Sequence, residues 1–184
     1  MIYNKDFREV IKDLDKENTL IIIDPPYNVG WQYDTYKDNL SKEDYSSLFA
    51  YFQGYKLVVI HYIEEIIEYI VPYMGVPTKV IQWIYNSQMP RQHRSIAFFN
   101  CKPDLSKVKQ PYKNLTDKRI LQNIKKTTAD DELIFDAFMG TGTTLAVASK
   151  LGYKYMGCDI SKKAYKITEN RLKKIENNLF NQPS

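Results

Sequence analysis

The sequence is poor in cysteine and histidine, with two of each among its 184 residues. Cys101 and Cys158 fall in different predicted elements, and His61 and His93 are isolated, so nothing has the ligand spacing of a zinc site. We therefore expect no metal and a reduced, cytoplasmic protein. No apolar run reaches the length of a membrane-spanning helix, and residues 1–10 alternate charged and apolar side chains, which excludes a signal peptide. We expect no membrane partner.

The composition is that of one globular domain, with 43% hydrophobic and 26% charged residues. We predict a single domain over residues 1–178 and a flexible tail over 179–184. The net charge of +4 is unevenly spread. Residues 1–74 carry 7 Lys/Arg and 13 Asp/Glu, whereas residues 75–184 carry 19 and 9. This asymmetry fits a polyanion held against one side of the fold, and equally fits lysines that solvate exposed helices.

Apolar runs of strand length alternate with helical periodicities along the chain. This order predicts a three-layer α/β domain with a mostly parallel sheet, in which ligands bind beyond the carboxyl ends of the strands. The predicted strands are residues 19–24, 56–61, 79–85, 95–100, 132–136 and 153–159, and the predicted helices are 41–52, 63–73, 115–124, 143–151 and 162–177.

A glycine-containing turn follows the predicted strand 132–136 and opens a helix. In the run Asp136-Ala-Phe-Met-Gly140-Thr-Gly142-Thr-Thr144, the glycines let backbone approach a ligand closely. The turn lacks the third glycine of a dinucleotide fingerprint and the Gly-Lys-Ser/Thr ending of a triphosphate loop. Phosphate binding is therefore not the natural interpretation, although many such turns are only tight strand–helix connections.

Asp159 ends the next predicted strand, 17 residues after Gly142. An acid there can accept hydrogen bonds from both hydroxyls of a ribose, or it can cap the helix that begins near Ser161. A turn without phosphate chemistry, together with a ribose-binding acid, describes an adenosine ligand with a non-phosphate tail. S-adenosylmethionine fits that description.

The tetrapeptide Asp24-Pro25-Pro26-Tyr27 ends a buried strand. The exocyclic amino group of adenine or cytosine is a poor nucleophile because its lone pair is delocalised into the ring. A carboxylate (Asp24) and a carbonyl fixed by prolines (that of Pro25) can accept its two N–H bonds, and an aromatic ring (Tyr27) can stack on a flipped base. The alternative is a strand-terminating diproline with a packed tyrosine.

These motifs resemble those of the DNA amino-methyltransferases, and more narrowly of the beta group, in which the catalytic tetrapeptide precedes the cofactor turn. The resemblance also covers Ile81-Gln82-Trp83 and Gly157-Cys158-Asp159. It implies a Rossmann-like, permuted fold that uses S-adenosylmethionine. The implied catalytic residues are Asp24, Pro25, Pro26 and Tyr27, and the implied cofactor-binding residues are Asp136, Phe138, Gly140, Gly142, Thr143, Thr144, Asp159 and Lys113. An Asp-headed tetrapeptide is more usual in adenine enzymes, which implies an N6-methyladenine product.

The sequence departs from the family pattern in three places. Ala137 stands where a proline is usual, and Lys113 belongs to only a partial match of the stretch that contacts the methionine end of the cofactor. The target-recognition region, near residues 86–113, is minimal. We therefore expect short or loose sequence specificity, or a homodimer in which a second copy supplies the missing surface.

Basic loops are the remaining candidates for binding DNA. Arg91, Gln92 and Arg94 can make bidentate base contacts, whereas Lys109 is suited to phosphate. A solvated hairpin tip is the alternative for this loop. Trp31, in the tyrosine-rich segment 28–39, could close over a flipped base or, with Tyr33, pack on the neighbouring helix.

Other functions stay open at this point. RNA bases or the 4-amino group of cytosine pose the same chemistry, and a non-catalytic nucleic-acid-binding partner could keep the fold. A glutamine-modifying protein methyltransferase is disfavoured, because its tetrapeptide begins with Asn and follows the cofactor turn. The sequence does not reveal whether a companion restriction endonuclease exists.

Overall fold

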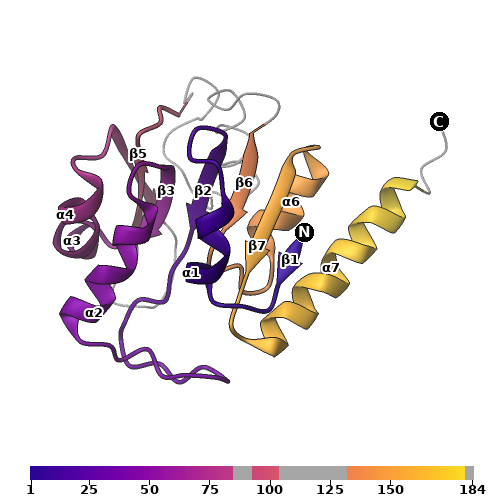
Figure 1. Ribbon diagram of the computed structural model, residues 1–184, viewed down its shortest axis with the longest axis horizontal. Helices are drawn as coiled ribbons and strands as arrows, with labels where there is room; N and C mark the ends of the chain where they lie inside the picture. Colours follow the sequence, from indigo (N-terminus) through magenta and orange to yellow (C-terminus); the bar gives the residue numbers. More distant parts are fainter. Residues whose placement is uncertain (85–92, 104–131, 181–184) are drawn as a thin grey trace.

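The computed structural model describes residues 1–84, 93–103 and 132–180, and the side chains of these residues up to 177. A seven-stranded sheet lies at its centre, in the order β1-β7-β6-β2-β3-β5-β4 (Figure 1). The pairs β1–β7, β7–β6, β6–β2 and β2–β3 are parallel, and β3–β5 and β5–β4 are antiparallel. The strands are β1 (Ile2–Tyr3), β2 (Thr19–Ile23), β3 (Lys56–His61), β4 (Lys79–Ile84), β5 (His93–Phe99), β6 (Leu133–Asp136) and β7 (Lys154–Cys158).

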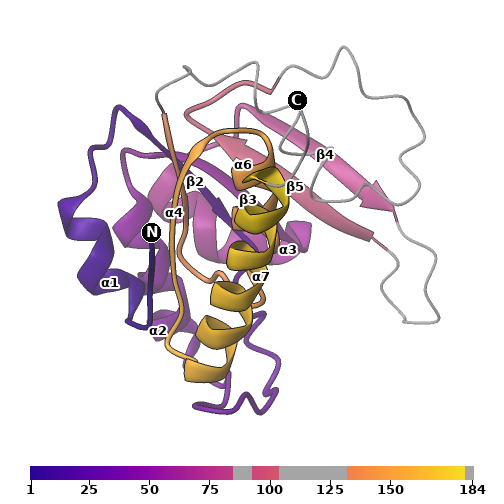
Figure 2. The ribbon, with the colours of Figure 1, turned by 90° about the vertical axis from the view of Figure 1, so that its right-hand side faces the viewer.

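Helices cover both faces of the sheet, which confirms the predicted three-layer, Rossmann-like α/β fold. Alternate residues of β2 face opposite layers: Ile21 and Ile23 pack with one set of helices, and Leu20 and Ile22 pack with α6. The helical segments are α1 (Phe7–Val10), η1 (Ile11–Asp13), α2 (Lys42–Ser47), η2 (Leu48–Phe52), α3 (Ile63–Glu65), η3 (Ile66–Ile70), α4 (Val71–Met74), α6 (Thr143–Lys150) and α7 (Lys162–Phe180). Figure 2 shows α7 in front of the sheet, and strands β5 and β4 form one edge of that sheet.

The predicted helix over 63–73 is interrupted in the structure. It consists of α3, a π-helical turn at η3 and α4, and it ends at Gly75 with φ +75°. Pro72 has no N–H to donate and its ring crowds the preceding turn, which explains a widened turn just before it. The predicted helix over 41–52 likewise splits into α2 and the 3₁₀ segment η2, with the Ser41 hydroxyl accepting the Asp44 N–H as an N-cap.

The ends of the chain differ from the prediction. Strand β1 and helix α1 were not predicted, because two and four residues are too short to show a periodicity. The tail was predicted to begin at residue 179, but α7 continues to Phe180. The predicted helix over 115–124 lies outside the described residues. No helix in the described ranges is long and apolar enough to cross a membrane.

The topology brings the three motif-bearing strand ends to one edge of the sheet. Strand β2 lies between β6 and β3, and β7 lies on the other side of β6. The chain leaves these parallel strands at Asp24, Asp136 and Asp159, so all three acids lie at neighbouring carboxyl ends. The sheet therefore positions the candidate site.

Candidate active site

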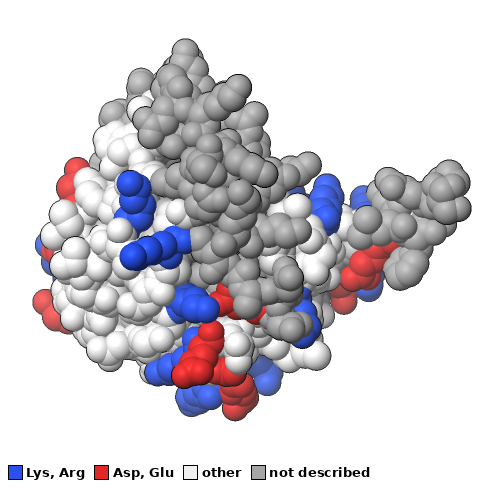
Figure 3. Space-filling model, turned by 90° about the horizontal axis from the view of Figure 1, so that it is seen from above, with Lys and Arg blue, Asp and Glu red and all other residues white. Residues whose placement is uncertain are grey.

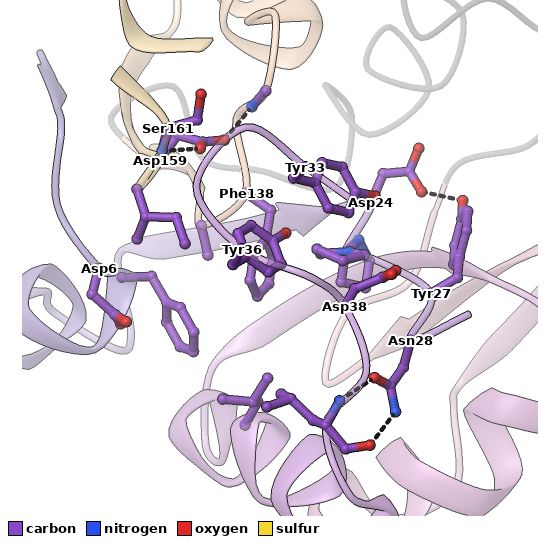
Figure 4. A pocket seen from close by; sticks show the side chains of 18 of the residues that line it. Asp6, Asp24, Tyr27, Asn28, Tyr33, Tyr36, Asp38, Phe138, Asp159 and Ser161 are labelled. Carbon is purple, nitrogen blue, oxygen red and sulfur yellow. Dashed lines mark hydrogen bonds between the residues drawn. The ribbon is translucent and has the colours of Figure 1, made fainter. Parts of the chain in front are cut away.

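A cavity of about 520 Å³ lies at the carboxyl ends of β2, β6 and β7 (Figure 4). Its volume is in the range of small-molecule and cofactor sites. It collects the whole predicted tetrapeptide and several predicted cofactor residues. The predicted residues that line it are Asp24, Pro25, Pro26, Tyr27, Arg94, Phe138, Gly140 and Asp159.

The Asp24 carboxylate is accessible, with 48% of its side chain exposed. One of its oxygens, Oδ1, accepts a hydrogen bond from the Tyr27 hydroxyl, and the other lies 3.4 Å from Nη1 of Arg94. Burial and the neighbouring negative charge of Asp24 raise the pKa of the Tyr27 hydroxyl well above its usual value, so it stays a donor. Asp24 is thus an exposed acceptor at the rim of the cavity rather than one half of a buried ion pair.

Tyr27 presents its ring to a cationic side chain. The Arg94 guanidinium carbon lies 4.6 Å from the ring centroid, and the ring packs edge-on against His61 at 4.8 Å. Arg94 belongs to β5, and 25% of its side chain is exposed. Arg94 was predicted to lie in a loop, so its place beside Asp24 and Tyr27 corrects that prediction and excludes a solvated hairpin tip for this residue.

Two buried side chains, those of Tyr45 and His61, fix the position of the Pro25–Pro26 turn through hydrogen bonds. The Tyr45 hydroxyl lies 2.6 Å from the Pro26 carbonyl oxygen, to which it donates, and 2.9 Å from Nε2 of His61. The Tyr62 N–H donates to Nδ1 of His61 at 2.8 Å. A neutral imidazole that accepts at Nδ1 carries its proton on Nε2, so His61 donates to Tyr45, which donates to Pro26. This chain of donors holds the second prolyl carbonyl in place.

The turn after β6 is held by Asp159 and by Thr168, whose hydroxyl donates to the Gly140 carbonyl at 2.9 Å. The Gly140 N–H donates to Oδ2 of Asp159 at 2.9 Å, and the Ser161 N–H donates to Oδ1 at 2.8 Å. Each carboxylate oxygen can accept a further hydrogen bond from a ligand. Burial raises the pKa of Asp159, although these two N–H groups oppose the shift. The cap of α7 is Ser161, whose hydroxyl accepts the Ala164 N–H at 3.0 Å, so Asp159 itself is not the helix cap.

The two glycines of this turn have different surroundings. Gly140, with φ +50°, borders the cavity, and apart from its chain neighbours only the Phe138 carbonyl oxygen among the described residues comes within 4 Å of where a Cβ would lie. A Cβ on Gly142 would instead lie 2.5 Å from Cγ2 of Thr168 in α7, and its φ is +74°. Thr168 thus fills the space beside Gly142, which lines neither this cavity nor the smaller one described below, and a role of Gly142 toward a ligand stays a prediction.

Asp136, Thr143 and Thr144 were predicted to bind the same ligand, but they line a separate, smaller cavity of about 240 Å³. Asp24, Phe138 and Gly140 border both cavities. Burial raises the pKa of Asp136 to about 7, against hydrogen bonds from Thr144 and the Phe138 N–H. Asp136 also holds the turn after β6, because its Oδ1 accepts the Phe138 N–H at 3.1 Å.

A hairpin after the tetrapeptide covers one side of the cavity (Figure 4). The Asn28 side chain clamps both the N–H and the carbonyl of Leu40, at 2.8 and 2.9 Å. Tyr33 stacks on Tyr36 with ring centroids 4.9 Å apart, and both line the cavity. Trp31 is 66% exposed and is not among the lining residues.

Several lining residues carried no clear sequence signal. Asp6 and Phe7 come from the short α1, and the Phe7 ring lies 5.1 Å from that of Phe138. Tyr45 and the hairpin acid Asp38 are the others that matter for the chemistry. Only Asp6 followed three residues later by Glu9, a pattern typical of a helix start, could have indicated α1.

Four predicted residues lie outside the described ranges: Arg91, Gln92, Lys109 and Lys113. The uneven charge of the sequence can be compared with the face of the molecule opposite the cavity. There, in Figure 3, acidic side chains lie among the basic ones of the described residues. Within the described ranges, no group of three His, Cys, Asp or Glu side chains could hold a metal ion.

The fold and the site define a Rossmann-like α/β protein with a cofactor-sized cavity beside an Asp-Pro-Pro-Tyr turn. The sequence profile of a family described as DNA methylase, of the N6/N4 type, matches residues 79–170, which is half of the chain. The chain belongs to this DNA methylase family.

Local similarity to named relatives agrees with that assignment. The chain is 43% identical over 51 residues to the type II methyltransferase M2.LlaDCHI of Lactococcus lactis subsp. cremoris, covering 28% of this chain and 19% of that protein. It is 38% identical over 55 residues to M.HinfI of Haemophilus influenzae, covering 30% and 15%. The matched segments thus span less than a fifth of these relatives.

Solved structures share the fold over nearly the whole chain. The complex of M1.HpyAVI with SAM superposes with a TM-score of 0.66 at 21% identity, covering 94% of this chain and 98% of that one. The PvuII DNA methyltransferase, described as cytosine-N4-specific, has a TM-score of 0.69 at 16% identity and coverages of 100% and 93%. At these identities the likeness shows the fold alone.

Proposed function

We propose that this chain transfers a methyl group from S-adenosylmethionine to the exocyclic amino group of adenine in DNA, giving N6-methyladenine. One observation carries the proposal: the Asp24–Tyr27 turn, the Phe138–Gly140 turn and Asp159 surround a single cavity. They come from three adjacent strand ends, so an acceptor amino group and a methyl donor can be held within reach of each other.

The tetrapeptide supplies the groups that an amide-like nitrogen needs. Asp24 offers an exposed carboxylate oxygen to one N–H of the amino group. The Pro25 carbonyl is the second acceptor, and its position depends on Pro26, which Tyr45 holds from beneath. Hydrogen bonds to both N–H groups draw the nitrogen toward a pyramidal form, in which its lone pair becomes available.

The Tyr27 ring is the stacking surface for a base that has left the helix. The planar Arg94 guanidinium lies over that ring. A base that stacks on the same face displaces Arg94 from Tyr27 and from Asp24, leaving a cation at the mouth of the site next to the DNA backbone.

The residues present fit S-adenosylmethionine, which when bound supplies a methyl group made electrophilic by its sulfonium. Asp159 has acceptor capacity left for ribose hydroxyls, Phe138 and Phe7 form an apolar wall for the adenine ring, and Gly140 allows close approach. The turn after β6 lacks the Gly-Lys-Ser/Thr ending of a triphosphate-binding loop.

Adenine is proposed over cytosine because the tetrapeptide begins with Asp, as is more usual in adenine enzymes of the resembling group. DNA is the proposed nucleic acid because the family is described as DNA methylase. Methylation of the 4-amino group of cytosine, or of an RNA base, would use the same groups. A homodimer, a companion restriction endonuclease and a cytoplasmic location stay predictions, and sedimentation velocity tests the first.

The test uses radiolabelled S-adenosylmethionine with duplex DNA from a methylation-deficient host, single-stranded DNA and RNA. Label should enter DNA, and mass analysis of the digest should identify N6-methyladenine. Asp24→Ala should abolish incorporation, whereas Asp13→Ala, an exposed acid away from the cavity, should not. Label in N4-methylcytosine or in RNA would replace the proposed substrate, and unchanged incorporation with Asp24→Ala would refute the catalytic assignment.

A further inference from the structure

The hairpin of residues 28–40 holds one acidic residue in a fixed backbone position at the cavity. The Asp38 N–H donates to the Trp31 carbonyl at 3.0 Å, and the Asp38 carbonyl accepts the Gly30 N–H at 2.9 Å. The hairpin is anchored to the turn after β7, because the Ser161 hydroxyl donates to Asp34 at 2.8 Å. The backbone of Asp38 is thus fixed by hydrogen bonds within the hairpin, and the hairpin is itself tied to the turn after β7.

The side chain of Asp38 is buried without a partner. The residue is 3% exposed and lines the cavity, yet neither carboxylate oxygen has a hydrogen-bond donor among the described residues. Figure 4 shows it among the labelled side chains of the cavity, between Tyr36 and the Tyr27–Asn28 turn. Its negative charge contributes to the raised pKa values of Tyr33, Tyr36 and Tyr45, after desolvation by burial.

An unpaired buried carboxylate costs folding free energy, and polar groups that are buried normally have partners. Asparagine at this position would keep the backbone hydrogen bonds and avoid the charge. The presence of an acid that destabilises the unliganded protein is explained if a bound ligand supplies a cation that neutralises its charge. Aromatic rings around the carboxylate favour the same kind of ligand.

We propose that Asp38 binds the ammonium group in the amino-acid tail of the methyl donor. The inference rests on the proposed function, because it takes S-adenosylmethionine as the ligand of the cavity. That molecule has two cationic groups. The sulfonium carries no N–H or O–H and cannot satisfy a carboxylate, whereas the ammonium has three donors and can serve both oxygens of Asp38.

Isothermal titration calorimetry of the full chain with three ligands tests this. S-adenosylmethionine and S-adenosylhomocysteine both carry the ammonium, and 5′-methylthioadenosine lacks the amino-acid tail. Asp38→Asn should weaken binding of the first two by about 10- to 100-fold and change binding of the third less than about twofold. The exposed Glu43→Gln, on α2, makes the same change of charge outside the cavity and should alter none.

Three calorimetric results would overturn the assignment: equal losses for all three ligands, a loss for S-adenosylmethionine alone, or no loss. The first would make Asp38 a shaping residue, and the second would assign it to the sulfonium. If the unaltered protein binds none of the ligands, the proposed function fails as well. If it binds all three and Asp38→Asn changes nothing, only this inference fails.

Unfolding without ligand gives an independent measurement. Asp38→Asn should leave the Tm unchanged or raise it, because a buried charge is removed, while the shift of Tm on adding S-adenosylhomocysteine should shrink. A lower Tm without ligand would indicate a structural role and overturn the inference. Asp38→Ser serves as a second neutral variant, and it should reproduce the loss of the ligand-induced shift.

Discussion

The Tyr45 hydroxyl donates a hydrogen bond of 2.6 Å to the carbonyl oxygen of Pro26, linking the buried face of α2 to the turn proposed to be catalytic. The same hydroxyl lies 2.9 Å from Nε2 of His61, which is completely buried at the end of β3. Neither residue belongs to the tetrapeptide. Their contact explains how a turn at the edge of a sheet keeps the rigidity that its chemistry requires.

Tyr45→Phe should lower kcat for methyl transfer by about tenfold and leave KM for the cofactor nearly unchanged, since Tyr45 positions the turn. It should also cost about 1–3 kcal/mol of unfolding free energy, because the buried hydrogen bond between Tyr45 and His61 is lost. Tyr55→Phe is the matched control. The Tyr55 hydroxyl donates to the carbonyls of Ile11 and Leu14, away from the turn. Its variant should lose stability but retain kcat, and equal losses of kcat would argue against a positioning role.

Arg94→Ala should weaken DNA binding by about tenfold and reduce the slope of log K against log salt by about one, since one cation is removed from the DNA-facing side. Fluorescence anisotropy with labelled duplex at several salt concentrations measures both quantities. Affinity for S-adenosylmethionine should not change. A salt slope identical to that of the unaltered protein would mean that Arg94 stays inside the protein and never contacts phosphate.

Gly142→Ala should lower the unfolding free energy by about 2–4 kcal/mol, because the new Cβ meets Thr168 in addition to an unfavourable positive φ. Gly152→Ala is the control. Gly152 has a similar φ of +78°, but in the described part of the chain no atom beyond its sequence neighbours lies within 4 Å of a Cβ, so its loss should be about 1 kcal/mol. Urea unfolding compares the two variants, and equal losses would show that the contact with Thr168 is easily relieved.

Asp136 should make stability fall as the pH rises. Its pKa is raised from 3.8 to about 7, so between these values the folded protein binds more protons than the unfolded chain. The stabilisation is complete below pH 4 and is lost through pH 7, at most about 4 kcal/mol. Urea unfolding at pH 5 and pH 8 should show a smaller decline for Asp136→Asn. Parallel declines in both proteins would contradict the raised pKa.

Local pattern was sufficient for much of the fold. The apolar runs at β2 and β3 and the periodicity of α6 and α7 predicted elements of the right type, because burial on both faces of a parallel sheet leaves a readable run. It failed at β1, whose two residues form a strand only by pairing with β7. It also placed Arg94 in a loop, because a charged residue near a turn carries no local sign that its backbone pairs with a distant strand, as Arg94 does with Trp83 of β4.

The sequence by itself determined the two turns and the acid that follows β7, since Asp24–Tyr27, Gly140 and Asp159 carry their chemistry in their residue types and their places at strand ends. The order of the strands, the bracing of Pro26 by Tyr45, the separation of Asp136 from the larger cavity and the burial of Asp38 were decided only by tertiary structure. These features depend on which distant segments pack together. Desolvation and donor geometry depend on neighbours in space, about which adjacent residues in the chain carry little information.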